Sequence, residues 1–210
     1  MSKLYAFLKV IASPFFKLFF RLKFKKPTNE LDGEGCLICS NHLSAIDPAF
    51  VGLGMKRQVR FLAKAEVTRL PIIHALAKRF AITINRGKGD LAAIRASIAA
   101  VEEKNALVVF PQGTRRKGLV PAQTEVKSGI AMIAARAKCG IIPAYIYTKN
   151  YRVRLFRKVT VIYGEPITFE ELGIEKGSME EYDRAAAFVW ERICSLAPTE
   201  EVNGNGNNSR

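Results

Sequence analysis

The residues best suited to acid–base chemistry lie in one short polar stretch, Asn41-His42-Leu43-Ser44-Ala45-Ile46-Asp47-Pro48. His42 is one of only two histidines in the chain, and a carboxylate, Asp47, follows five positions later. Residues five apart do not share a face of a continuous helix, so only a turn brings them together. Asp47 then accepts a hydrogen bond from one ring nitrogen while the other nitrogen takes a proton from a hydroxyl. The alternative is a plain strand-to-helix turn, in which Asp47 only caps a helix that begins at Pro48.

Two later loops place cations beside glycines. One is Asn85-Arg86-Gly87-Lys88-Gly89-Asp90, and the other is Pro111-Gln112-Gly113-Thr114-Arg115-Arg116-Lys117-Gly118. Arginine grips a phosphate through two parallel hydrogen bonds, and the amides of a glycine turn add further donors. Lys64 follows another apolar run, and Lys127 precedes a helical pattern. Each cation alone is equally well explained as a solvated surface charge, but their repeated position after apolar runs favours an anion site.

These loops must be positioned by the elements on either side of them. The sequence predicts strands over Cys36–Ser40, Val59–Ala63, Phe80–Ile84, Leu107–Phe110, Ile141–Tyr147 and Thr160–Tyr163. Helical periodicity predicts helices over Pro48–Met55, Glu66–Lys78, Asp90–Val101, Ser128–Lys138 and Ser178–Ser195. This alternation predicts an α/β fold with a mixed, largely parallel sheet flanked by helices. Ligands of such sheets bind beyond the carboxyl ends of the strands, where the three polar loops lie.

The N-terminal segment differs in composition from the rest. Residues 1–26 hold seven basic side chains, no acid and six of the thirteen phenylalanines. Aromatic and basic residues at helical spacing, interrupted at Ser13-Pro14, predict two amphipathic helices that lie in the headgroup region of a membrane. The alternative is a helix packed on its own domain or on a partner subunit. We predict three segments: 1–26 at the membrane interface, 27–197 as an α/β domain and 198–210 as a disordered tail.

Composition narrows the possible functions further. The net charge of +14 over 210 residues favours an anionic partner. Nucleic acid is not expected, because the aromatics gather in the N-terminal segment rather than on a strand. No run is long and apolar enough to span a bilayer, and no G-x-S-x-G motif suggests a serine hydrolase. Cys36 and Cys39 point to opposite faces of a strand, so we expect buried free thiols and no metal site.

Taken together, four sequence blocks resemble those of the glycerolipid acyltransferases, most closely the bacterial 1-acylglycerol-3-phosphate (lysophosphatidic acid) acyltransferases. The N-H-x-x-x-x-D block is Asn41-His42 to Asp47, and the second block ends in an arginine, Ile82-Thr83-Ile84-Asn85-Arg86. The F-P-E-G-T-R block corresponds to Phe110-Pro111-Gln112-Gly113-Thr114-Arg115, and the fourth block is Ile141-Ile142-Pro143-Ala144. Their order and spacing fit from about residue 30 to residue 170.

The resemblance implies a function. His42 would be the general base, oriented by Asp47, and would deprotonate the free hydroxyl of a lysophospholipid for attack on an acyl thioester of coenzyme A or acyl carrier protein. No other cofactor and no acyl-enzyme are implied. Arg86, Gln112, Gly113, Thr114 and Arg115 would bind the acceptor and its phosphate, with Lys64 and Lys127 adding charge. The N-terminal helices would dock on the cytoplasmic face of the cell membrane.

One residue departs from the family pattern, because Gln112 stands where the family has glutamate. Glutamine keeps the size and an acceptor oxygen but loses the charge. The sequence therefore leaves two alternatives to phosphatidic acid synthesis. One is a relative that uses another lysophospholipid or glycerol-3-phosphate as acceptor, and the other is a weakened or silent binder of anionic lipid.

Overall fold

The computed structural model describes residues 2–25, 31, 33–64, 80–84 and 89–198. Within these ranges the chain forms one seven-stranded sheet with the order β1-β7-β6-β2-β5-β3-β4. The strands are β1 (Lys23–Lys25), β2 (Cys36–Ser40), β3 (Val59–Lys64), β4 (Ala81–Ile84), β5 (Ala106–Val109), β6 (Ile141–Thr148) and β7 (Val159–Tyr163). Strands β2 to β6 run parallel, β7 runs antiparallel to β6, and β1 is parallel to β7. The predicted mixed, largely parallel sheet is therefore confirmed.

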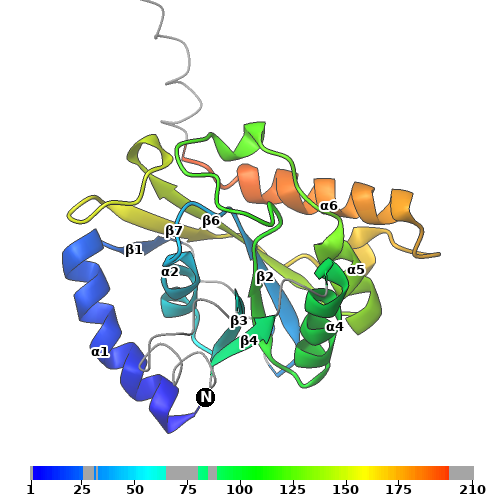
Figure 1. Ribbon diagram of the computed structural model, residues 1–210, viewed down its shortest axis with the longest axis horizontal. Helices are drawn as coiled ribbons and strands as arrows, with labels where there is room; N and C mark the ends of the chain where they lie inside the picture. The colour runs from blue at the N-terminus through cyan, green and yellow to red at the C-terminus, as the bar shows by residue number, and fades with distance from the viewer. Residues whose placement is uncertain (1, 26–30, 32, 65–79, 85–88, 199–210) are drawn as a thin grey trace, which may run out of the picture.

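Helices cover both faces of this sheet (Figure 1). They are α1 (Lys3–Phe20), α2 (Asp47–Gly54), α4 (Gly89–Glu102), α5 (Gly129–Ala137) and α6 (Met179–Cys194), with short 3₁₀ turns at Pro121–Gln123, Lys149–Tyr151 and Glu170–Leu172. Side chains of α1 and α2 enter one buried cluster, and side chains of α4, α5 and α6 enter the other. The sheet therefore separates two apolar cores.

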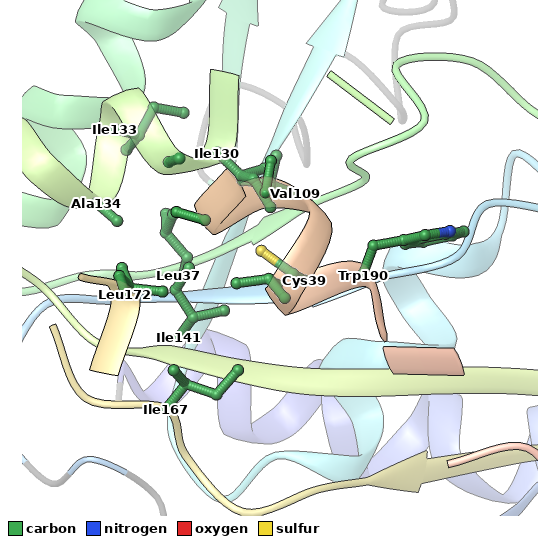
Figure 2. Close-up of a cluster of buried hydrophobic side chains, with 14 of the residues drawn as sticks. Leu37, Cys39, Val109, Ile130, Ile133, Ala134, Ile141, Ile167, Leu172 and Trp190 are labelled. Atoms are coloured by element: carbon green, nitrogen blue, oxygen red, sulfur yellow. The ribbon is translucent and has the colours of Figure 1, made fainter. Parts of the chain in front are cut away.

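Strand β2 belongs to both cores, because successive side chains of a strand point to opposite faces. Leu37 and Cys39 pack with Trp190 of α6 in the cluster of Figure 2, whereas Cys36 and Ile38 pack on the α1 and α2 side. The predicted opposite placement of the two thiols is confirmed, and both are buried and form no disulfide within the described residues. Burial raises the pKa of the Cys39 thiol well above its usual range. Burial also raises the pKa of Cys139 to about 12, so these thiols are structural rather than reactive.

The N-terminal segment differs from its prediction in two ways. Instead of two helices, α1 is one helix that continues through Pro14. Proline removes a single N–H donor from the interior of the helix, and packing of the buried face compensates for that loss. Residues Lys23–Lys25 form an edge strand beside β7, so the segment predicted to end at residue 26 joins the main sheet. The predicted helix over 66–78, most of the linker after residue 26 and the tail from residue 199 lie outside the described residues.

Helix α1 is apolar on two of its faces. Tyr5, Phe16 and Phe19 pack against the core beside α2. The outer face exposes six large apolar side chains: Leu4, Phe7, Val10, Ile11, Phe15 and Leu18. Among the described residues, no helix, α1 included, combines the length and the apolar character needed to cross a membrane.

Candidate active site

The histidine and aspartate of the N-terminal polar stretch meet in the fold. Nδ1 of His42 lies 2.8 Å from Oδ2 of Asp47. Asp47 is fully buried, whereas the His42 side chain keeps 17% of its surface exposed. No described residue hydrogen-bonds to Nε2 of His42. The arrangement is that of an oriented base, with its free nitrogen turned away from the carboxylate.

The carboxylate of Asp47 serves this loop and not the helix behind it. Oδ2 accepts hydrogen bonds from the backbone N–H groups of Leu43 at 2.6 Å and Ser44 at 2.7 Å, besides the one from His42. Helix α2 begins at Asp47, and Ile46 occupies the capping position without a side-chain bond. The alternative reading of Asp47 as a plain cap is therefore wrong. The two amides fix the position of Oδ2, and Oδ2 in turn accepts the ring N–H and orients the imidazole.

The backbone of His42 is fixed by the loop that follows β5. Its N–H donates to Oε1 of Gln112 at 2.7 Å, and its carbonyl accepts from the N–H of Arg116 at 2.7 Å. The imidazole stacks on the ring of Phe110, with centroids 4.0 Å apart and planes 14° apart. The first and third sequence blocks therefore interlock around the base, as expected at the shared carboxyl edge of β2 and β5.

Gln112 has a different role from the predicted one. Its side chain is 2% exposed, and its Nε2 donates to Oγ1 of Thr124 at 2.6 Å. The Thr124 hydroxyl donates in turn to the carbonyl of Pro121 at 2.7 Å. Both ends of the amide are therefore used within the chain, so Gln112 positions the backbone of His42 instead of binding the acceptor.

Asn41 is a functional position whose role the sequence analysis missed. Its side-chain amide pairs with the backbone of Ile146 in both directions, donating to the carbonyl at 3.0 Å and accepting from the N–H at 2.7 Å. This pairing extends the contact of β2 with β6 by one residue beyond the strand. Asn41 thereby fixes the point at which the chain leaves the sheet for His42. The sequence shows that Asn41 precedes His42 in the first block, but it carries no signal for a hydrogen bond to the buried backbone of Ile146.

The remaining predicted anion-binding residues surround the same edge. Thr114, Arg115 and Lys127 are exposed. Gly113 adopts a φ of +65°, and a Cβ there would lie 3.2 Å from the Cδ and Cε atoms of Lys127. The positive φ favours glycine at this turn, and the flexible stem of Lys127 lies against it. Lys64 ends β3 at the same sheet edge, and Arg86 lies outside the described residues.

Two hollows flank the base. An apolar groove of about 140 Å³ lies between α1 and α2, and its lining includes Phe16, Phe61 and the first turn of α2 at Pro48 and Ala49. On the other side of the sheet, a larger pocket of about 500 Å³ is lined by Phe110, Gly113 and Lys127, among others. The second pocket is also mainly apolar, and Lys127 is the one cation among its described lining residues. The described residues hold no group of three potential metal ligands.

Comparison with known proteins agrees with this arrangement. The sequence model of the acyltransferase family matches residues 21–147, which include the base, its carboxylate partner and the loop after β5. This chain belongs to the acyltransferase family. A 1-acyl-sn-glycerol-3-phosphate acyltransferase of Bacillus subtilis is 28% identical over 63% of this acyltransferase and 67% of its own length. One from Helicobacter pylori is 27% identical over 65% of this chain and 64% of its own length.

The fold has a solved counterpart. The crystal structure of the 1-acyl-sn-glycerophosphate (LPA) acyltransferase of Thermotoga maritima matches with a TM-score of 0.67, at 21% identity, over 95% of this chain and 78% of that one. This likeness concerns the fold. The alignments with the two bacterial relatives span about two thirds of those proteins. Their shared name supports an O-acyltransferase enzyme.

Proposed function

We propose that this acyltransferase moves a fatty acyl group from an acyl thioester to the free hydroxyl of 1-acylglycerol-3-phosphate, giving phosphatidic acid. The donor is acyl-CoA or acyl carrier protein. The observation that carries the proposal is the 2.8 Å contact between His42 and Asp47, with the second ring nitrogen unbonded within the described chain. The names of the relatives support the acceptor.

The chemistry needs only a base and an activated donor. Nε2 of His42 takes the hydroxyl proton as the alkoxide oxygen attacks the thioester carbonyl carbon. The C–S bond then breaks, the ester remains on the acceptor, and the imidazolium returns the proton to the leaving thiolate. Asp47 stabilises the imidazolium while it exists. An alcohol is a weak nucleophile at neutral pH, so the base supplies a large share of the rate.

The cations and the apolar groove of the site match the two chemically different parts of such an acceptor. Arg115 and Lys127, with Arg86 as a predicted third cation, suit the phosphate of the headgroup. The apolar groove between α1 and α2 suits a fatty acyl chain. The exposed apolar face of α1 suits the membrane from which a lysolipid enters, at the cytoplasmic face.

The decisive experiment measures release of free coenzyme A thiol from acyl-CoA when lysophosphatidic acid is added. His42→Ala should lower the rate by about 10²- to 10⁴-fold. Asp47→Asn is a useful second variant, because an amide oxygen in the place of Oδ2 can accept the same three hydrogen bonds while the charge is removed, although an NH2 group then replaces the buried, unpartnered Oδ1. No release by the wild type, across coenzyme A and carrier-protein donors of several chain lengths, would sink the proposal.

A silent binder of anionic lipid is the second candidate, and the glutamine at position 112 is the observation that favours it. Gln112→Glu distinguishes the two functions. Glutamate keeps the acceptor for the His42 N–H, but its second oxygen faces a Thr124 hydroxyl that already donates to Pro121. For an active enzyme we expect Gln112→Glu to change the rate only a few-fold. A rate that rises from zero only in Gln112→Glu would establish the silent binder instead.

A further inference from the structure

We propose that the turn between β6 and β7, residues 149–158, is a second membrane contact that binds the phosphates of anionic phospholipids and inserts an aromatic tip. We call these residues the basic turn. The inference rests on the proposed function, because it assumes that the acceptor is taken from a membrane. The basic turn is a separate segment of the chain from α1, whose end it adjoins, and it is distinct from the phosphate residues of the active site.

The first observation is charge. The basic turn holds five cations and no acid: Lys149, Arg152, Arg154, Arg157 and Lys158. Arg21 follows the end of α1 and joins Lys149, Arg154, Arg157 and Lys158 in lining an open hollow of about 510 Å³. None of these six side chains forms an ion pair with any described residue. Like charges held together without a counterion are favourable only where an anion neutralises them, as at an anionic lipid surface.

The second observation is the exposed apolar tip. Leu155 is 59% exposed and Phe156 is 66% exposed, between Arg154 and Arg157. Phe156 also has a φ of +60°, a region that a bulky side chain rarely adopts. Such strain persists only where surrounding structure enforces it, and it gathers at functional sites. An aromatic ring held in solvent by a strained backbone, with cations on both sides, has the chemistry of a residue that enters the acyl boundary.

The third observation is position. The N–H of Phe156 donates to the carbonyl of Phe19 at 2.5 Å, and the two rings lie 5.7 Å apart. The tip is thus fastened to the C-terminal end of α1, beside which Figure 1 draws it. Because α1 carries the exposed apolar face, the tip and the helix form one continuous surface. This continuity favours a lipid surface over an acidic protein as the occupant.

The basic turn also adjoins the active-site edge. It follows the carboxyl end of β6, the edge at which β2 delivers His42. The N–H of Gly118, in the loop after β5, donates to the carbonyl of Tyr151 at 2.9 Å. A Cβ at Gly118 would lie 2.9 Å from Nε of Arg152, so the guanidinium rests on that loop. Contact of the turn with headgroups therefore brings the acceptor-binding loop to the membrane.

The test uses the full chain and vesicles of equal parts phosphatidylglycerol and phosphatidylcholine. Arg154→Gln/Lys158→Gln removes two exposed cations, and each is expected to account for about a fivefold change, so binding should weaken about 30-fold at low salt. The matched control is Arg95→Gln/Lys176→Gln, which removes two exposed charges from α4 and the segment before α6. We expect the control to bind within threefold of the wild type and the difference to shrink in high salt.

The tip is tested separately. Leu155→Gln/Phe156→Asn should weaken binding about tenfold, and asparagine tolerates the left-handed backbone, so folding is not at risk. Leu91→Gln/Met179→Gln, at exposed apolar residues elsewhere, is its control. A Phe156→Cys/Cys194→Ser protein labelled with an environment-sensitive fluorophore should show a blue shift on vesicles. A Lys176→Cys/Cys194→Ser protein should show none.

Equal vesicle binding by the charge variant and its control, or an unshifted fluorophore at position 156, would overturn the inference. So would a charge variant that binds vesicles like the wild type but loses turnover only with acyl carrier protein, because the surface would then be a protein dock. Turnover of a short-chain lysophosphatidate without vesicles separates the two proposals. If the wild type shows no such turnover, the proposed function is wrong, and the vesicle-binding results alone then test the role of the basic turn.

Discussion

The first and last helices of the described chain have similar lengths and similar starts but opposite surfaces. Helix α1 has 18 residues and α6 has 16, and each begins after a serine that caps its first turn. In α6, buried residues such as Val189 and Trp190 form one stripe, while its exposed positions are mostly charged and Met179 is the only large apolar one. In α1 the exposed side is itself apolar. Water completes the environment of α6, whereas the outer face of α1 is the one that we propose contacts lipid.

The largest effect should come from the buried side of α6. Trp190→Ala removes a ring that is 8% exposed and packs in the α6 core. We expect a loss of about 3–5 kcal/mol in the free energy of unfolding and a fall in Tm of roughly 10 °C. Thermal unfolding followed by circular dichroism measures this. Vesicle binding of the folded variant should be unchanged, and a parallel loss of binding would contradict the division between the two helices.

The outer face of α1 should give the reverse result. Phe7→Gln/Ile11→Gln/Leu18→Gln replaces three exposed apolar side chains with a good helix former. If each half-buries in lipid for about 1 kcal/mol, vesicle binding should fall roughly 100-fold. Tm in solution should stay within 2 °C of the wild type, as in a Met179→Gln control. A large fall in Tm would mean that protein, not lipid, covers this face.

Removal of the two serine caps should give smaller changes in Tm that also differ between α6 and α1. Ser178 and Glu181 form a capping box at the start of α6, with Oγ of Ser178 accepting from the N–H of Glu181 at 3.2 Å. Ser178→Ala should lower Tm by about 2–4 °C, because α6 is part of the core. Ser2→Ala in α1 should lower it less, since the end of a terminal helix frays without global unfolding. Equal shifts would show that α1 unfolds together with α6.

The smallest effect is a pH dependence confined to α6. Desolvation raises the pKa of Glu181, but hydrogen bonds from the N–H groups of Ser178, Gly177 and Lys176 outweigh it and bring the pKa below the ordinary 4.5. A carboxyl with a lowered pKa stabilises the fold above its ordinary value and loses that effect as the pH falls through the folded-state pKa. The Tm difference between wild type and Glu181→Gln should therefore shrink from pH 6 to pH 3. A Tm difference that does not change with pH would mean that the charge of Glu181 does not contribute and that only its hydrogen-bond geometry matters.

Patterns that depend on local sequence predicted the framework well. Six strands were placed within a residue of their observed ends, because buried parallel strands are continuous apolar runs. The helix after Ser178 was recognised by its cap. Strand β1 was missed, since three residues with two lysines carry no strand pattern and form only beside β7. The two-helix prediction failed at Pro14 because tertiary packing overrides a local breaker.

The site was predicted in part. The pairing of His42 with Asp47 follows from types and spacing, yet the sequence could not choose between a base partner and a cap. The choice depends on where the Leu43 and Ser44 amides point. Gln112 was assigned to the acceptor because a polar residue in a motif carries no mark of burial. Phe110 and Thr124 act through stacking and a hydrogen bond across the fold, and neither has a sequence signal.

The double attachment of His42 has a consequence for how the enzyme exchanges its substrates. The loop after β5 donates one backbone bond to His42 and accepts another through Gln112. If this loop moved outward as a lid, it would displace His42 or leave the N–H and carbonyl of His42 without hydrogen-bond partners. If the substrate is a lipid, as proposed, its entry and departure require movement of other segments while the loop after β5 keeps its bonds to His42. Slow steps of the cycle are accordingly to be sought in the N-terminal helix rather than in the motif itself.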